Sequence, residues 1–199
     1  MTKIKLDEIF TIADIDFINL GTDKETGGII GVTKDRVFAS RFGYNNNFAE
    51  SDILPRLNAE VLPKIEEAVG PDGVLEFNLD LKSRYHPNLY ADLRTKIGLP
   101  TLDIYINNSY RLTQGNHDYY WLSTASDVCV YYVSSSGGYS DCHTQGNTLD
   151  VRPMLVFNPS IFETYHVCQY CGQITDGMDE DVLCEDCQET FGHTLFSQL

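Results

Sequence analysis

The chain is poor in basic residues and has no long apolar run. Its 199 residues include 14 lysines and arginines against 29 aspartates and glutamates, which gives a formal net charge of −15. No stretch approaches the roughly 18 consecutive apolar residues that a membrane-spanning helix needs. Residues 1–8 lack the apolar segment of a signal peptide. We therefore expect a soluble, cytoplasmic protein with no membrane partner.

The common sequence motifs of catalysis are also missing. The chain contains no HExxH, GxSxG, P-loop or GxGxxG motif, and the glycines of residues 27–31 lack dinucleotide-binding spacing. Cys142 and His143 are a nucleophile and a base side by side, but neighbours on a strand point to opposite faces. We interpret Cys142 and Cys129 as partly buried thiols. Asp14, Asp16 and Asp118 are too few oxygen ligands for calcium. We predict that the protein is not an enzyme.

Residues 153–199 carry the strongest positive signal. Cys168, Cys171, Cys184 and Cys187 form two CxxC pairs separated by twelve residues, which is the spacing of a zinc ribbon. The alternative is two disulfides or a redox pair, but a redox motif does not come twice and no βαβ pattern surrounds it. We expect one structural Zn²⁺ per chain, because four thiolates leave no position for a reactive water. Such cysteines favour a reducing cytoplasm.

The surroundings of this cysteine motif are acidic. Residues 153–199 hold eight acidic residues and no lysine or arginine, and four thiolates around one zinc add about two negative charges. Binding nucleic acid requires basic residues that neutralise phosphates, so we expect no direct nucleic-acid binding. A basic protein surface is the expected partner, although the charge could also serve solubility alone. The candidate acidic contacts are Asp176, Asp179, Glu180, Asp181, Glu185 and Asp186.

Apolar periodicity predicts an α+β domain over residues 1–160, with mixed or antiparallel strands and short helices, followed by the acidic zinc ribbon over 161–199. Residues 54–68 have helical spacing after a cap at Ser51 or Asp52, and Pro63 makes two short helices as plausible as one. A second helix should run from Thr101 to about residue 106. Strands are expected at 9–12, 17–20, 29–32, 37–42, 74–81, 119–122, 128–133 and 151–157.

Tyrosine is concentrated between residues 119 and 139, where five tyrosines accompany a Ser-Ser-Ser-Gly-Gly run. Tyrosine, serine and glycine are common in adaptable protein-binding surfaces, which makes Tyr131, Tyr132 and Tyr139 candidate contacts. The alternative is that tyrosine is simply a favoured strand residue. Alternation predicts Tyr131 on one face of its strand and Tyr132 on the other.

Several short boxes resemble a domain family of unknown function that is frequent in phages and in Firmicutes. They are Tyr120-Trp-Leu-Ser-Thr-Ala, Val128-Cys-Val-Tyr-Tyr-Val and Val151-Arg-Pro-Met-Leu, with related segments at 48–58 and 99–103. Their order is similar to that in C-type-lectin-like and formylglycine-generating-type domains, and it covers roughly residues 17–162. Ser123 and Leu57 depart from the arginine and tryptophan common in the family. Trp121 should fill core volume, and Arg152 should hydrogen-bond loop carbonyls.

The resemblance and the charge together imply a phage or prophage inhibitor that binds a basic host nucleoprotein in the cytoplasm of the host bacterial cell. Effector nucleases of type II CRISPR systems hold guide RNA and DNA in positively charged channels, so the chain resembles an anti-CRISPR protein. One alternative is a lectin-like module of the virion that binds a receptor or glycan. Another is a metal-dependent oxidase of the formylglycine-generating type, which would need a redox metal at paired cysteines.

Overall fold

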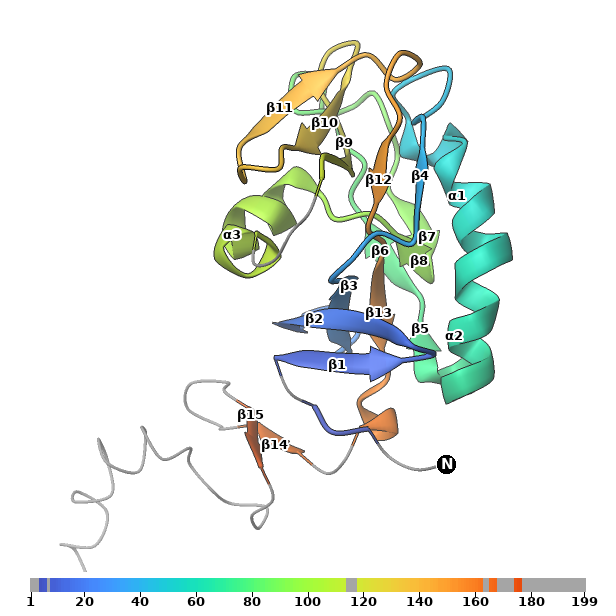
Figure 1. Cartoon of the computed structure of the whole chain (residues 1–199), viewed down its shortest axis with the longest axis vertical. Helices are drawn as coiled ribbons and strands as arrows, with labels where there is room; N and C mark the ends of the chain where they lie inside the picture. Colours follow the sequence, from blue (N-terminus) through green and yellow to red (C-terminus); the bar gives the residue numbers. More distant parts are fainter. Residues whose placement is uncertain (1–3, 7, 114–117, 163–164, 168–173, 177–199) are drawn as a thin grey trace, which may run out of the picture. The chain divides into compact units, whose positions relative to one another are not determined.

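A computed structural model describes residues 4–6, 8–113, 118–162, 165–167 and 174–176 (Figure 1). These residues belong to two compact units. The larger unit covers 8–161, and the smaller one takes in 4–6 together with the described residues from 162 onward. The larger unit is a mixed α+β domain built mostly of antiparallel strands, as the sequence predicts.

The first sheet of the larger unit begins with the predicted meander. Strands β1 (Ile9–Ile12), β2 (Ile15–Thr22) and β3 (Ile29–Thr33) are antiparallel neighbours. Strand β13 (Met154–Phe157) pairs with β3 and also with β5 (Val74–Leu75) and β8 (Ile97–Gly98). The rings of Phe10, Phe17 and Phe157 pack with centroids 5.0–5.6 Å apart. This aromatic cluster packs the first strands of the larger unit against its last strand in one core.

The second sheet has the strand order β11-β10-β9-β12-β4. Its strands are β4 (Phe38–Ser40), β9 (Tyr120–Ala125), β10 (Val130–Val133), β11 (Tyr139–Cys142) and β12 (Leu149–Val151). The predicted single strand over 151–157 is wrong, because β12 ends before Arg152 and β13 starts after Pro153. Proline has no N–H to donate to a ladder, so it marks the point where the chain leaves one sheet for the other.

The predicted strand at 74–81 is also divided. It forms β5 and then β6 (Phe77–Leu79), which pairs separately with β7 (Leu93–Thr95). The sequence does not predict β7, β8 or β11, which are only two to four residues long. Strands β7 and β11 pair with the strands that precede them, β6 and β10, whereas the partner of β8 is the distant β13. Short 3₁₀ turns occur at η1 (Phe48–Glu50), η3 (Pro71–Gly73) and η4 (Pro159–Ile161).

The predicted helix at 54–68 is one continuous helical segment. It consists of α1 (Ile53–Arg56), a π-helical turn η2 (Leu57–Val61) and α2 (Leu62–Val69). Pro63 lies in the first turn of α2, and the wider π turn before it accommodates the clash that proline causes upstream. Ser51 Oγ accepts from Leu54 N at 3.2 Å, which confirms a cap at Ser51. Helix α3 (Leu102–Leu112) starts at the predicted cap Thr101 but runs past residue 106.

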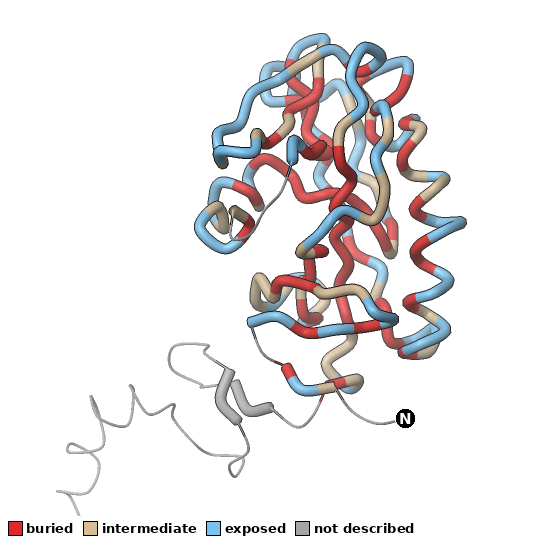
Figure 2. The backbone as a smooth tube through the Cα atoms, in the orientation of Figure 1, coloured by how far each residue is buried: buried red, intermediate tan, exposed pale blue. Residues whose placement is uncertain are grey.

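Burial follows the sheets and the inner side of the helical segment (Figure 2). Trp121 is fully buried against Phe42, and its Nε1 donates to the carbonyl of Ser40 at 2.9 Å. The prediction that Trp121 fills core volume is confirmed. No helix among the described residues is long and apolar enough to cross a membrane.

In the smaller unit, β14 (Tyr165–Val167) and β15 (Ile174–Asp176) form an antiparallel pair. Cys168 and Cys171 fall between these strands in the sequence. All four predicted zinc ligands lie outside the described residues, as do Asp179, Glu180, Asp181, Glu185 and Asp186. Asp176 is the last residue of β15.

Candidate functional site

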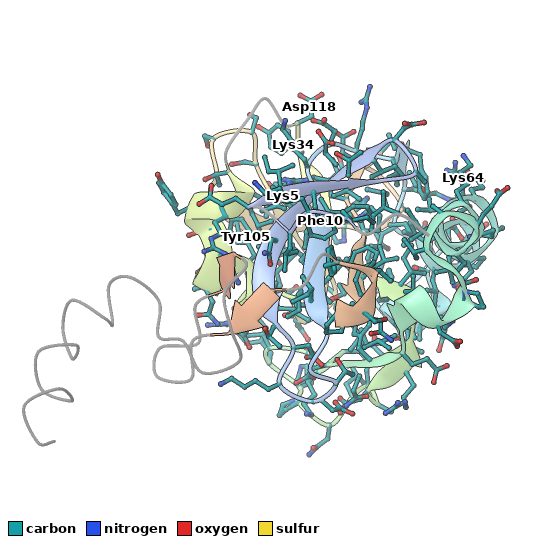
Figure 3. The ribbon with its side chains drawn as sticks, turned by 90° about the horizontal axis from the view of Figure 1, so that it is seen from below. Lys5, Phe10, Lys34, Lys64, Tyr105 and Asp118 are labelled. Carbon is teal, nitrogen blue, oxygen red and sulfur yellow. The ribbon has the colours of Figure 1, made fainter. Side chains whose placement is uncertain are left out.

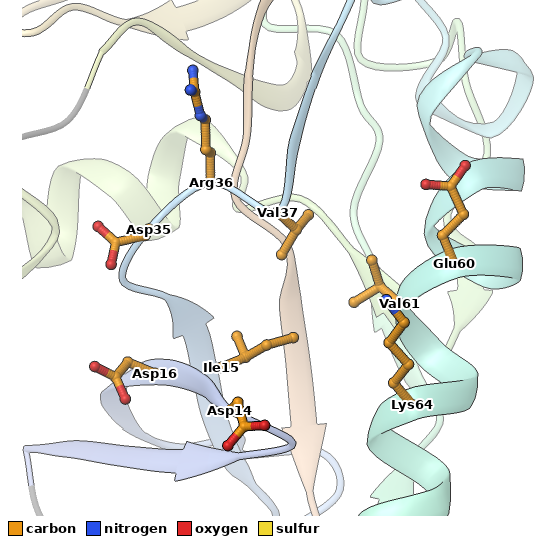
Figure 4. A pocket seen from close by; sticks show the side chains of 9 residues that line it. All are labelled: Asp14, Ile15, Asp16, Asp35, Arg36, Val37, Glu60, Val61 and Lys64. Carbon is orange, nitrogen blue, oxygen red and sulfur yellow. The ribbon is translucent and has the colours of Figure 1, made fainter.

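The larger unit has a cavity of about 390 Å³ between the β1–β2 turn, the residues that follow β3, and the η2–α2 helix. Figure 4 shows Asp16 and Asp35 at one end of this cavity, Ile15 and Val37 in the middle, and the helix residues at the other end. Its lining comprises Asp14, Ile15, Asp16, Asp35, Arg36, Val37, Glu60, Val61 and Lys64. The cavity therefore combines an apolar floor with three carboxylates on one side and Glu60 beside Lys64 on the helix side.

A tight turn places Asp14 at the edge of the cavity. Ile12 pairs directly with Ile15, so Ala13 and Asp14 alone connect the strands. Their φ angles are 51° and 59°, in the left-handed region that such turns need at both central positions. Asparagine and glycine are the usual residues there. The backbone thus holds the Asp14 carboxylate at the tip of the hairpin.

Some of the charges that line the cavity already have partners. Asp16 accepts from Thr11 Oγ1 at 2.7 Å and has Lys34 Nζ at 3.9 Å. Glu60 pairs with Arg56 at 3.0 Å, and this hydrogen bond is the main cause that lowers the pKa of Glu60. Arg36 pairs with Asp150 at 3.1 Å.

The remaining charged groups of the lining lack direct partners, although Lys64 interacts electrostatically with Glu60 and Asp35 with Arg152. Asp14, Asp35 and Lys64 form no hydrogen bond or ion pair with the described residues. Arg36 points away from the cavity in Figure 4, and Lys64 projects from α2 in Figure 3. Two carboxylates and one ammonium group are therefore available to a ligand.

The carboxylates do not form a metal site. Within the described ranges, no group of three or more His, Cys, Asp or Glu side chains is arranged to hold a metal ion. The sequence draws attention to Asp14 and Asp16, but Asp35, Glu60 and Lys64 have no local signal. They come from two other segments, and only the packing of the helix beside the first sheet brings them to the cavity.

The tyrosine-rich region divides into packed and exposed side chains. The register pairs Tyr131 with Asp141 and Tyr132 with Ser140, which confirms the predicted alternation. Tyr131 is only 7% exposed, whereas Tyr139 is 48% exposed. Burial, followed by a hydrogen bond with Tyr85, raises the pKa of Tyr131 to about 12. Of the three candidate tyrosines, Tyr139 is thus the most accessible and Tyr131 serves mainly in packing.

Arg152 is a buried cation that joins three parts of the fold. Its Nε donates to Thr33 O at 2.9 Å and its Nη1 donates to Leu112 O at 3.0 Å, while its guanidinium lies 4.6 Å from the centre of the Tyr120 ring. Leu112 ends helix α3, where the helix dipole favours a positive charge. Burial lowers the pKa of Arg152. The prediction that Arg152 hydrogen-bonds backbone carbonyls is confirmed, but these carbonyls end a strand and a helix and do not belong to loops.

The two cysteines of the larger unit are half-buried free thiols, as predicted. Cys142 lies opposite Val130, and the group near His143 is instead Cys129, with 3.7 Å between Sγ and Nδ1. This contact depends on the register of β10 and β11 and cannot be deduced from sequence spacing. Burial is the main cause that raises the pKa of both thiols. A raised pKa is the opposite of the activation that a nucleophilic cysteine needs.

Basic side chains of the larger unit are mostly paired with acids. Eight of them form ion pairs with aspartate or glutamate: Lys34, Arg36, Arg41, Arg56, Lys82, Arg84, Arg94 and Lys96. Since acidic residues outnumber basic ones twofold, this pairing leaves a surplus of carboxylates and few free cations.

The chain matches no family model, no curated protein and no solved structure in comparisons with each of these. The resemblance to phage and C-type-lectin-like domains therefore stays a prediction from the sequence boxes.

Proposed function

We propose that this protein is a non-catalytic, acidic interaction module that binds a basic protein surface. The observation that carries the proposal is the pairing of eight basic side chains with carboxylates in a chain of net charge −15. Phosphates need free lysine and arginine, and here most of those groups are engaged. A surface with surplus carboxylates attracts a partner of opposite charge and speeds its association.

The partner that we propose is a type II CRISPR effector nuclease, which makes the protein a phage or prophage anti-CRISPR inhibitor. A nuclease of this kind has a positively charged channel for guide RNA and target DNA. An acidic protein seated in this channel competes with the nucleic acid for the same basic groups. The proposed phage origin rests on the resemblance of the sequence boxes around Trp121 and Arg152 to a domain family that is frequent in phages.

We propose further that Cys168, Cys171, Cys184 and Cys187 hold one structural Zn²⁺. A zinc ribbon places each CxxC pair on a tight turn. In support, the antiparallel strands β14 and β15 flank the first CxxC motif, Cys168 and Cys171, in the sequence. All four ligands would be thiolates, so the metal would stabilise the smaller unit without activating water.

The test is a cleavage assay with purified type II effector nucleases and their guide RNA. We expect the full-length protein to bind the nuclease and block target cleavage at micromolar concentration. Inhibition should weaken as salt is raised, because salt screens the attraction between opposite charges. A glycan array with the same protein serves as the contrasting assay. Neither binding nor inhibition of any effector, together with specific glycan binding, would replace this proposal with the lectin-like alternative.

A further inference from the structure

We propose that the cavity between the β1–β2 turn and the η2–α2 helix receives an arginine side chain of the basic partner protein. This inference rests on the proposed function, because it names a contact by which that partner would be recognised. It uses the apolar floor, the free carboxylates and the position of Lys64 together.

The size and floor of the cavity fit a side chain. At about 390 Å³ it lies at the small end of ligand pockets, which range from about 300 to 1,000 Å³. Ile15 and Val37 occupy its middle, and Val61 on the helix side is only 4% exposed. An apolar floor offers nothing to an isolated ion. It matches the aliphatic stem that arginine lays along apolar surface while its charged head stays near polar groups.

The spread of the carboxylates favours a guanidinium group. Asp14 and Asp35 form no hydrogen bond or ion pair with the described residues, and they come from different loops. The acidic groups do not converge as a metal ion requires. A guanidinium carries five N–H donors in a flat fork, so one group can serve two separated carboxylates. A lysine ammonium is a compact point charge that lacks this fork.

Lys64 sets the direction in which the side chain enters. It lies at the helix end of the cavity, and Asp35 lies at the other end (Figure 4). Glu60 at the helix end already pairs with Arg56, and Lys64 repels a second cation there. The guanidinium therefore belongs at the Asp35 end and the partner's backbone near the helix. If Lys64 instead bound a carboxylate of the ligand, its removal would weaken binding. If the ligand is an arginine side chain of a protein, removal of the Lys64 charge should strengthen binding.

The first experiment uses Nα-acetyl-arginine amide as the probe and the full-length, zinc-containing protein with labelled methyl groups. We expect the methyl resonances of Ile15 and Val61 to shift on titration, with the exposed Val128 methyls as the remote control. The uncharged analogue Nα-acetyl-citrulline amide should cause no shift. Asp35→Asn should weaken binding at least about tenfold, as expected for one charge-assisted hydrogen bond. Lys64→Gln should tighten it roughly twofold.

Asp72→Asn is the matched control, because Asp72 is exposed and lies outside the cavity lining. It removes the same charge and should leave the titration unchanged. Unmoved Ile15 and Val61 resonances, or equal binding to Asp35→Asn, would overturn the cavity assignment whatever a nuclease assay gives. A thermal melt of each variant checks that it is folded.

The second experiment uses the effector nuclease. The Asp14→Asn/Asp35→Asn variant should need at least about tenfold more protein for equal inhibition, and Asp72→Asn should match the wild type. Equal inhibition by the double variant would leave the proposed function standing and remove the arginine contact. Probe binding without inhibition would support the cavity assignment and exclude this nuclease as the partner.

Discussion

At the scale of single residues, Arg152 has the clearest structural role. It supplies hydrogen bonds to two backbone carbonyls, one at the end of β3 and one at the end of α3. We expect Arg152→Met to lower the free energy of unfolding by about 2 kcal/mol, because both buried carbonyls lose their donor. Arg111→Met is the control, since exposed Arg111 also donates to a carbonyl, that of Asn19 at 2.9 Å. Urea denaturation measures both, and equal losses would contradict the role assigned to burial.

Tyr131 should make stability depend on alkaline pH. Its pKa of about 12 lies above the ordinary tyrosine value of about 10, so folding favours the neutral phenol. The corresponding stability is fully present below pH about 10 and is lost as the pH rises toward about 12. We expect the free energy of unfolding to fall across this range, and to fall less steeply in Tyr131→Phe. Tyr110→Phe, whose ring is 81% exposed, should keep the wild-type slope.

At the scale of secondary structure, Gly31 shows why a glycine interrupts the apolar run of β3. A Cβ at this position would lie 2.8 Å from Phe157 Cε2 and 2.9 Å from Phe10 Cζ. Gly31→Ala should destabilise the protein by about 1–3 kcal/mol through overpacking of the aromatic cluster. Gly146→Ala, where nothing lies within 4 Å, should have a much smaller effect. Thermal denaturation of the two variants makes this comparison.

The proposed zinc ribbon is tested by replacing single cysteines and measuring the bound zinc. Cys187→Ser should reduce bound zinc well below one ion per chain and unfold the ribbon, because structural zinc contributes on the order of 10 kcal/mol in such small sites. Cys129→Ser, which changes a cysteine of the larger unit, should retain full zinc content. Metal analysis of the purified variants gives the result. Unchanged zinc in Cys187→Ser would show that the four cysteines do not form one site.

The sequence predicts the elements whose signals are local. Strands β1 to β3 and the caps at Ser51 and Thr101 follow from alternation and from side chains that bond within a few residues. The divisions at Glu76 and at Arg152-Pro153 were missed, because which sheet each half joins depends on distant strands. The cavity was missed for the same reason, since its three segments meet only in the folded chain.

At the scale of the whole molecule, charge and topology have separate consequences. The charge is visible in the composition, and the folded structure adds that eight of the basic groups are already paired. The spatial order of the strands is not visible in composition. It brings the separate loops of Asp14 and Asp35 to the lining of one cavity and leaves the tyrosines partly packed.

The break at Pro153 determines how the larger unit comes apart. The chain passes directly from β12 in one sheet to β13 in the other. It also crosses between the sheets from β3 to β4, from β4 to β5 and from β8 to β9. Unfolding of either sheet should therefore disrupt strand pairing in the other sheet as well. We expect a single unfolding transition for residues 8–161, with the slowest amide hydrogens of β9 and β13 exchanging at the same free energy of opening. Native-state hydrogen exchange that separates these two strands would mean that the sheets are independent cooperative units.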